Sequence, residues 1–130
     1  MHVINCADIE GVLIPKPYER LVKVIMAPDT QEDVEDISIT MGIIAPHSRN
    51  DLHTHEDGVE VLYIATGYGK AVVGDTVYDL KANHLIIAPK GMPHQQINES
   101  AETMRMLAIW TPAVSGEEVI ERARKAAQVK

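Results

Sequence analysis

The feature that most restricts the fold of this chain is a series of short β-type segments separated by turn signals, from about residue 37 to residue 112. Apolar residues occupy alternate positions from Ile37 to Ile43, and this period of two predicts a strand with one face in a core. Lys70–Val73 and Thr76–Leu80 flank Gly74-Asp75, a two-residue link that suits a tight hairpin because glycine accepts a positive φ. The sequence therefore predicts at least three strands before residue 81.

Further strands are expected after this hairpin. Asn83, one of the few non-glycine residues that tolerates left-handed geometry, turns the chain into His84–Ala88, with His84 expected on the outside. Pro89-Lys-Gly91 ends that strand, and Thr103–Thr111 is the last long one. Many short strands at this spacing favour an all-β sandwich or barrel.

The C-terminal segment changes to helical periodicity. Ser115-Gly-Glu-Glu118 is typical of a capping box. In this motif the Ser115 hydroxyl accepts a hydrogen bond from the Glu118 amide, and the Glu118 carboxylate accepts one from the Ser115 amide. Apolar residues then recur at helical spacing, at Val119, Ile120, Ala123 and Ala127. We expect one helix over about residues 116–128, packed on the outside of the β structure.

Length and composition narrow the class of protein. The 130 residues suit one domain, expected to span 1–130, and no apolar run approaches the roughly 20 residues of a membrane helix. The net charge of −7 argues against nucleic-acid and membrane-surface partners. A single cysteine, Cys6, and the absence of a secretion signal at the start of the sequence favour a cytoplasmic location.

Histidines and one glutamate form the most informative pattern. His53 and His55 are two residues apart, so on a strand both rings point to one face. If Glu56-Asp-Gly58 turns the chain, Glu60 returns close to them, and His94 offers a third imidazole from a later strand. Three imidazoles and one carboxylate suit one divalent transition metal such as manganese, iron, nickel, copper or zinc. The net positive charge of such a site favours a small anionic ligand.

These residues resemble the two motifs of the cupin superfamily. The first motif reads Gly, five residues, His-x-His, three or four residues, Glu, six residues, Gly, and His53, His55, Glu60 and Gly67 are in register with it. The second reads Gly, five residues, Pro-x-Gly, two residues, His, three residues, Asn, and is matched by Pro89, Gly91, His94 and Asn98. The departures are the leading glycines, whose positions are taken by His47 and Asn83.

The resemblance, which covers about residues 37–112, implies a double-stranded β-helix (a jelly-roll barrel) carrying a C-terminal helix. It implies a metal inside the barrel on His53, His55, Glu60 and His94. Small single-barrel cupins are usually homodimers, so a homodimer is expected as well.

Four further residues are candidates for contacts with a ligand. Gln96 should share the inward face of His94, where it could bind a ligand or orient a neighbouring imidazole. Arg49 precedes His53 and could meet a substrate carboxylate, although a solvated loop arginine is the simpler interpretation. Met106 and Trp110 lie on one face of the last strand and could form pocket walls as well as core.

Three functional hypotheses remain open. The first is a small metalloenzyme acting on a compact anionic or keto/enol metabolite, as a dioxygenase, a decarboxylase or lyase, or an isomerase. The second is a non-catalytic cupin that binds a small ligand or acts as a sensor. The third, a metal-independent sugar epimerase, is disfavoured because all four ligand positions are retained.

Overall fold

The computed structural model describes residues 2–128. The chain begins with a short 3-10 helix and ends with an α-helix, and strands occupy most of the sequence between them. In chain order the elements are η1 (Cys6–Asp8), β1 (Val12–Ile14), β2 (Arg20–Met26), β3 (Ser38–Ile44), β4 (Val59–Ile64), β5 (Tyr68–Val73), β6 (Thr76–Lys81), β7 (Leu85–Ala88), β8 (His94–Asn98), β9 (Met104–Thr111) and α1 (Gly116–Gln128).

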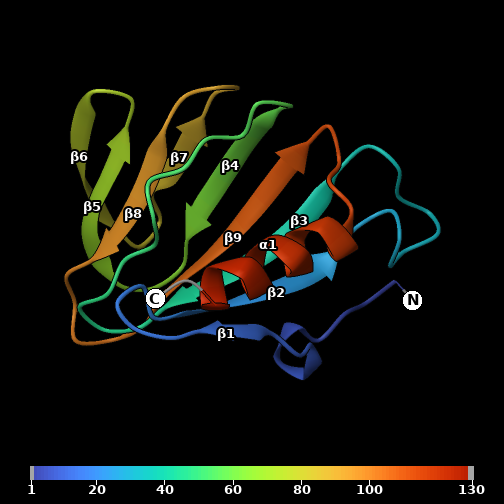
Figure 1. The fold of residues 1–130 in the computed structure, drawn as a ribbon, viewed down its shortest axis with the longest axis horizontal. Helices are drawn as coiled ribbons and strands as arrows, with labels where there is room; N and C mark the ends of the chain where they lie inside the picture. The colour runs from blue at the N-terminus through green and yellow to red at the C-terminus, as the bar shows by residue number, and fades with distance from the viewer. Residues whose placement is uncertain (1, 129–130) are drawn as a thin grey trace.

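The strands form two antiparallel sheets of unequal size. The larger sheet has the order β1-β2-β3-β9-β4-β7 and the smaller has the order β6-β5-β8. The smaller sheet stands at the left of Figure 1, facing one half of the larger sheet. Because neighbours such as β3 and β9 are far apart in the sequence, the two sheets together form the double-stranded β-helix expected from the strand pattern and the motifs.

The core lies between the sheets and is supplied mainly by the inward faces of β4 and β9. Its fully buried members include Ile44, Ile64 and Met104, and Met106 and Trp110 continue the same face of β9. Burying a side chain such as Ile64 contributes roughly 1.5–3 kcal/mol to stability. The alternating burial along β9 follows from the pleat, which sends successive side chains to opposite faces.

Strand β3 forms as predicted, but its interior face is not the isoleucine face. Ser38 and Thr40 point inward and are buried, whereas Ile39 and Ile43 are only half-buried on the other side. The small inward residues have specific partners, since Thr40 Oγ1 accepts a hydrogen bond from Trp110 Nε1 at 3.0 Å. The periodicity therefore predicted the strand correctly, but the expectation that its alternating apolar residues form the enclosed face was wrong.

Turn chemistry agrees with the sequence at Gly74 and Asn83, and His47 shows the same backbone geometry. Gly74 adopts a φ of +60° in the hairpin that pairs Val73 with Thr76. Asn83 and His47, which replace the leading glycines of the two motifs, also have positive φ values, of 74° and 57°. These replacements thus keep the backbone geometry that glycine would supply.

Helix α1 begins with half of the expected capping box. The Glu118 amide donates to Ser115 Oγ at 3.1 Å, but the Glu118 carboxylate accepts from Arg122 instead of returning to the Ser115 backbone. Asp29 supplies the remaining cap by accepting from the amides of Gly116 and Glu117 at 2.7 and 3.1 Å.

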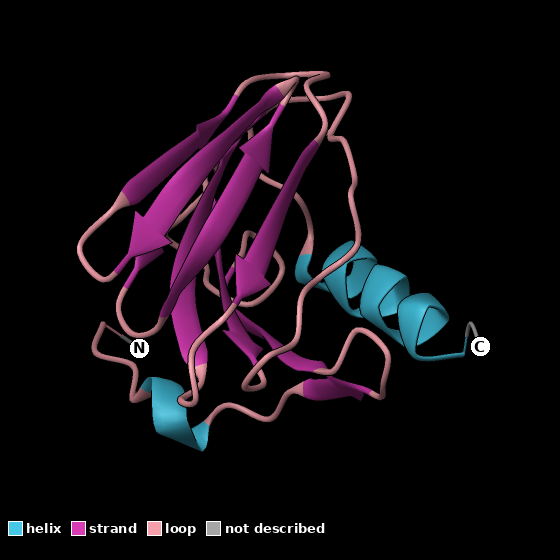
Figure 2. Cartoon of the chain, turned by 90° about the vertical axis from the view of Figure 1, so that its left-hand side faces the viewer, coloured by secondary structure: helices cyan, strands magenta, loops and turns pink. Residues whose placement is uncertain are grey.

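The helix packs against β1 and β2 and lies to one side of the strands (Figure 2). Val119 and Ala123 are its buried side chains on this face. They line the same internal cavity as Ile14 and Val22 of the larger sheet. The helix therefore closes a side of the interior that the smaller sheet leaves uncovered.

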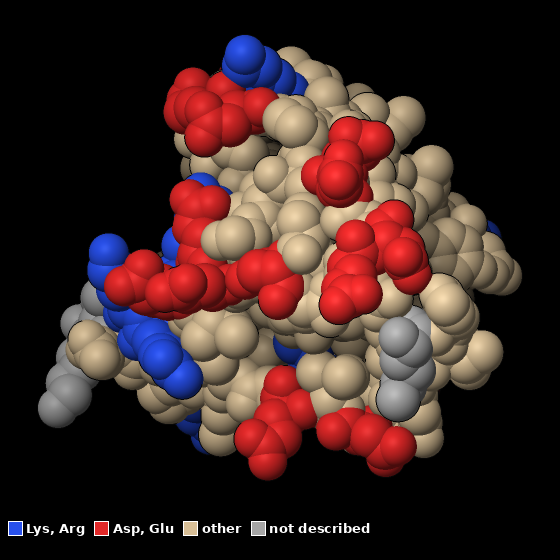
Figure 3. Space-filling model, turned by 90° about the vertical axis from the view of Figure 1, so that its right-hand side faces the viewer, with Lys and Arg blue, Asp and Glu red and all other residues tan. Residues whose placement is uncertain are grey.

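The surface reflects the acidic composition. Asp and Glu side chains gather over the face shown in Figure 3, with Lys and Arg mostly at its edges. Within residues 2–128, no helix is both long and apolar enough to cross a membrane.

Candidate metal centre

The candidate ligands come from three segments that converge at one end of the barrel interior. Glu60 lies on β4, where it pairs with Trp110 of β9, and His94 is the first residue of β8. His53 and His55 were expected on a strand, but the structure gives them only an extended segment that is held at two points. His53 forms an isolated bridge with His94, and the His55 carbonyl accepts from the Gly91 amide. A regular strand is therefore not needed to point both rings inward.

The four side chains form a compact group. One potential ligand atom from each residue lies within 4.8 Å of the other three. Glu60 Oε1 is 2.8 Å from His94 Nε2 and 3.1 Å from His55 Nε2. The rings of His53 and His94 are 4.3 Å apart between centroids. Glu60 is only 4% exposed and His94 only 1%, so the group stands at the inner end of a shielded site.

Backbone carbonyls orient two of the three imidazoles. His53 Nδ1 is 2.8 Å from the Asp51 carbonyl oxygen, and His94 Nδ1 is 3.1 Å from that of Met92. A carbonyl can only accept, so each Nδ1 carries the hydrogen and each Nε2 turns towards the cluster. This arrangement is common among metal-binding histidines, because it holds the ring in place and leaves one nitrogen to coordinate.

His55 is different. Its Nδ1 lies 3.4 Å from Nη1 of Arg122 on α1, a donor rather than an acceptor. Its Nε2 is buried and has no hydrogen-bond partner among the described residues, although Glu60 Oε1 is nearby. A buried ring nitrogen without a partner is unfavourable, and a bound cation would satisfy it.

The ionisable groups shift each other's pKa values. Burial opposes ionisation of Glu60, but the neighbouring His55 and His94 outweigh it and lower the pKa of Glu60 to about 2. Burial also opposes protonation of His94, yet its hydrogen bond to Glu60 and its contact with the Met92 carbonyl raise the pKa of His94. For His53, burial dominates and lowers the pKa. The metal-free site therefore holds an ionised carboxylate beside imidazoles of differing proton affinity.

A cavity of about 370 Å³ is lined by three of these residues, His53, His55 and Glu60. Its walls are mostly apolar and include Leu62, Met106 and Trp110, while its polar members are few. A largely apolar pocket with a small number of convergent polar groups is typical of small-molecule sites.

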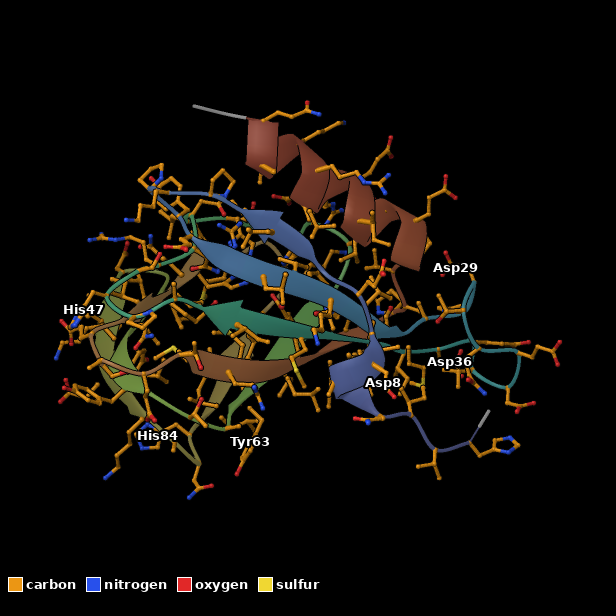
Figure 4. All side chains as sticks on the ribbon, turned by 90° about the horizontal axis from the view of Figure 1, so that it is seen from below. Asp8, Asp29, Asp36, His47, Tyr63 and His84 are labelled. Carbon is orange, nitrogen blue, oxygen red and sulfur yellow. The ribbon has the colours of Figure 1, made fainter. Side chains whose placement is uncertain are left out.

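Of the further candidates, three contribute to this cavity and one does not. Gln96, Met106 and Trp110 line it, whereas Arg49 is exposed and is not among the lining residues. His47 and His84 lie in loops far from the cluster, and Figure 4 shows them near the periphery of the molecule. Neither contributes to the four-residue group.

Comparison with known proteins supports what the geometry suggests. A family model described as the cupin domain matches residues 40–110, which is more than half of the chain. The chain belongs to the cupin family. No curated protein matches the sequence of this cupin.

Several solved structures share the fold. A predicted oxalate decarboxylase from Thermotoga maritima is 19% identical, with a TM-score of 0.75 over 85% of this chain and 98% of that chain. A polyketide cyclase from Streptomyces resistomycificus is 19% identical, with a TM-score of 0.71 over 89% of this chain and 85% of that one. A variant of Bacillus subtilis oxalate decarboxylase is 17% identical, with a TM-score of 0.74 over 90% of this cupin and 31% of that chain. At these identities the similarity establishes the fold alone.

The structure of this cupin adds site residues that the sequence analysis missed. Arg20, Asn50 and Arg122 all line the cavity, although Arg20 and Arg122 lie outside the motif region. The sequence offered one signal for Arg20, which is that this charged residue begins a segment of mainly apolar residues. Nothing local to α1 indicated that Arg122 would approach His55, because that contact depends on how the helix docks.

Proposed function

We propose that this cupin binds one divalent transition metal on His53, His55, Glu60 and His94. The observation that carries the proposal is the buried group of three imidazoles and a carboxylate with one unpartnered ring nitrogen, at the inner end of an open cavity. The donor set supports manganese, iron, nickel, copper or zinc over calcium or magnesium, because imidazole nitrogens dominate it.

The proposed activity is that of a small metalloenzyme acting on a compact anionic or keto/enol metabolite, of the dioxygenase, decarboxylase or lyase, or isomerase type. When bound, the metal would supply Lewis acidity, or oxygen chemistry if it is redox-active. The protein's own part is to hold the substrate and exclude water. The apolar walls formed by Leu62, Met106 and Trp110 shield the reacting end, and Gln96 offers a polar contact to the bound substrate.

A non-catalytic ligand-binding role is the second candidate, and one observation favours it. Apart from His53, His55 and Glu60, the ionisable residues among positions 2–128 that line the cavity are Arg20, Asp51 and Arg122. The arginines do not act as proton acceptors, and Asp51 is exposed and already paired with Arg20 at 3.1 Å. Reactions that need a dedicated protein base at the inner end of the cavity are thereby disfavoured.

Metal analysis tests the proposal directly. Protein purified without added metal or an affinity tag should contain about one equivalent of a transition metal by elemental mass spectrometry, or take one up on titration. His94→Ala should lose most of it, because it removes the only ligand supplied by β8, while His84→Ala, a histidine outside the cluster, should retain it. An empty site that refuses added metal, or full occupancy in His94→Ala, would overturn the assignment.

The identity of the metal then directs the search for activity. Iron or copper would call for oxygen-consumption assays on diketone, catechol-like and thiol substrates. Manganese, nickel or zinc would call for isomerase, lyase and decarboxylase assays on sugar acids and keto acids. A metal-loaded protein that binds small anions but turns none over would favour the ligand-binding candidate.

The proposal includes a homodimer and a cytoplasmic location. The outward face of the larger sheet supports association, because Leu85 and Ile87 of edge strand β7 are exposed, as are Tyr63 on the adjacent β4 and Ile109 on β9, the next strand along. Light scattering should give about twice the mass of one chain, and a monomer at micromolar concentration would contradict it. The free thiol of Cys6 is compatible with a reducing compartment.

A further inference from the structure

The side-chain amide of Gln96 is locked with its donor end unpaired. The Gln96 backbone amide donates to Asn50 Oδ1 at 2.8 Å, and an N–H can only donate, so this contact sets the orientation of the Asn50 carboxamide. Asn50 Nδ2 must then face Gln96, and it donates to Gln96 Oε1 at 2.9 Å. The NH₂ group of Gln96 is left with no partner among residues 2–128, although the side chain is only 1% exposed and lines the cavity.

Arg20 brings a positive charge to the same cavity. Arg20 is the first residue of β2, and its side chain is 12% exposed and lines the cavity. Nη1 donates to the Tyr18 carbonyl at 3.0 Å and Nη2 donates to Asp51 Oδ1 at 3.1 Å. A guanidinium has five N–H donors, so these two bonds position the group without exhausting it.

The position of Arg20 relative to the metal centre follows from this second bond. The carbonyl of the same Asp51 orients the His53 ring, so the guanidinium and the imidazole both contact this one residue. Gln96 is two residues after His94 on β8 and shares its inward face. Polar donors therefore border the cavity beyond the metal ligands, and apolar side chains such as Met106 and Val22 fill the space around them.

We infer that Arg20 and Gln96 form a carboxylate subsite of this cavity, which takes a compact carboxylic acid with an apolar body. The inference rests on the proposed function in one respect only, namely that the end of the ligand opposite its carboxylate would face the metal. A carboxylate at this subsite satisfies the unpaired Gln96 donors and accepts from the free N–H groups of Arg20. When the ligand enters, the exposed Asp51 either keeps its ion pair with Arg20 beside the ligand carboxylate or is displaced by that carboxylate.

Calorimetric titration with a charged and an uncharged probe of matched length tests this subsite. Hexanoate and 1-hexanol are titrated into the full-length protein, both as purified and after removal of metal by a chelator. In both preparations hexanoate should bind at least about tenfold more tightly than 1-hexanol, because a charge-assisted hydrogen-bonded pair at a shielded site is worth about ten- to hundredfold in affinity. Equal affinities for the two probes would overturn the inference.

Variants then locate the binding. Arg20→Met should weaken hexanoate binding about tenfold or more and leave 1-hexanol binding within twofold, which also shows that the cavity is intact. Gln96→Leu should weaken hexanoate binding several-fold. Arg49→Met, which removes an exposed arginine outside the cavity, should have no effect. If Arg20→Met fails to fold, Arg20→Lys retains the charge without the planar fork and should bind hexanoate with intermediate affinity.

Two further outcomes would refute the subsite. Unchanged hexanoate affinity in both Arg20 variants would show that the guanidinium does not contact the carboxylate. Loss of hexanoate binding on metal removal would place the carboxylate on the metal instead. A protein that binds no metal but discriminates hexanoate from 1-hexanol would contradict the proposed function and leave the subsite standing.

Discussion

Glu60→Gln separates the electrostatic role of the buried carboxylate from its shape. The amide is nearly isosteric, so the substitution leaves the packing around β4 in place and removes one negative charge. In the folded, metal-free protein the pKa of Glu60 falls from an ordinary 4.5 to about 2 because of the adjacent His55 and His94. That shift corresponds to about 3 kcal/mol of stabilisation of the ionised form.

The sign of the effect sets the conditions of the assay. A carboxylate whose pKa is depressed by folding stabilises the protein above its unfolded value of 4.5, and this contribution is lost as the pH falls through about 2. At neutral pH, Glu60→Gln should therefore reduce the free energy of unfolding of the metal-free protein by up to about 3 kcal/mol. Near pH 2 the variant and the parent should converge.

Metal affinity should respond more strongly. Removing a group that merely orients a metal ligand typically costs 10–100-fold in affinity, so replacing a charged ligand by an amide should cost at least about 100-fold. Competition with a chromophoric chelator measures this loss, and urea unfolding of the chelator-treated protein measures the stability.

Glu56→Gln is the matched control for both measurements. Glu56 lies in the adjacent loop, is exposed and accepts only a long bond from Thr54 at 3.3 Å. It should change neither the stability nor the metal affinity appreciably. If Glu60→Gln binds metal as tightly as Glu56→Gln, or if the two variants are equally stable at neutral pH, the buried carboxylate has neither of these roles.

Three further predictions concern protonation, the helix cap and the backbone. Because the pKa of His94 is raised above its usual 6.5, protons should compete with the metal for this ring, so metal affinity should fall as the pH is lowered through neutrality in competition titrations, and a flat profile would contradict this. Asp29→Ala removes two hydrogen bonds to the start of α1 and should lower the free energy of unfolding by about 1 kcal/mol. Amide hydrogen exchange should become faster mainly in α1, and uniform or unchanged exchange would argue against the cap. His47→Val should lower stability by about 1–2 kcal/mol because a β-branched residue resists a φ of 57°, whereas His47→Gly should be tolerated, and equal effects of the two would count against a conformational cause.

Much of the fold was predictable because local sequence determines local geometry. The Gly74 hairpin, the limits of α1 and the strand spacing all depend on residues that are close in the chain. The four candidate ligands were predictable for a related reason: two fixed spacings, each held by its own turn, bring them to the same end of a barrel. Even the departures at His47 and Asn83 keep a positive φ, so the motif geometry survives the loss of glycine.

What could not be predicted depends on contacts between segments far apart in the sequence. The inward face of β3 was misjudged because both of its faces are partly covered, and only the neighbouring sheet decides which side is enclosed. The cap of α1 by Asp29 joins residues 87 and 88 positions apart, so no local pattern could suggest it.

Alternation, turn residues and motif spacing are one-dimensional properties, so the all-β architecture and the likeness of four residues to a metal-ligand set could be inferred from the sequence. The residues that surround this set depend on how distant segments pack together. Arg20, rather than Arg49, faces the cavity because β2 runs beside β3 in the larger sheet, whereas the loop carrying Arg49 directs it to solvent. Arg122 reaches His55 only because α1 docks across the open side of the barrel. The charge and shape of a pocket are supplied by residues that can be any distance apart in the sequence. The selectivity of the pocket therefore depends on tertiary contacts that no local pattern contains.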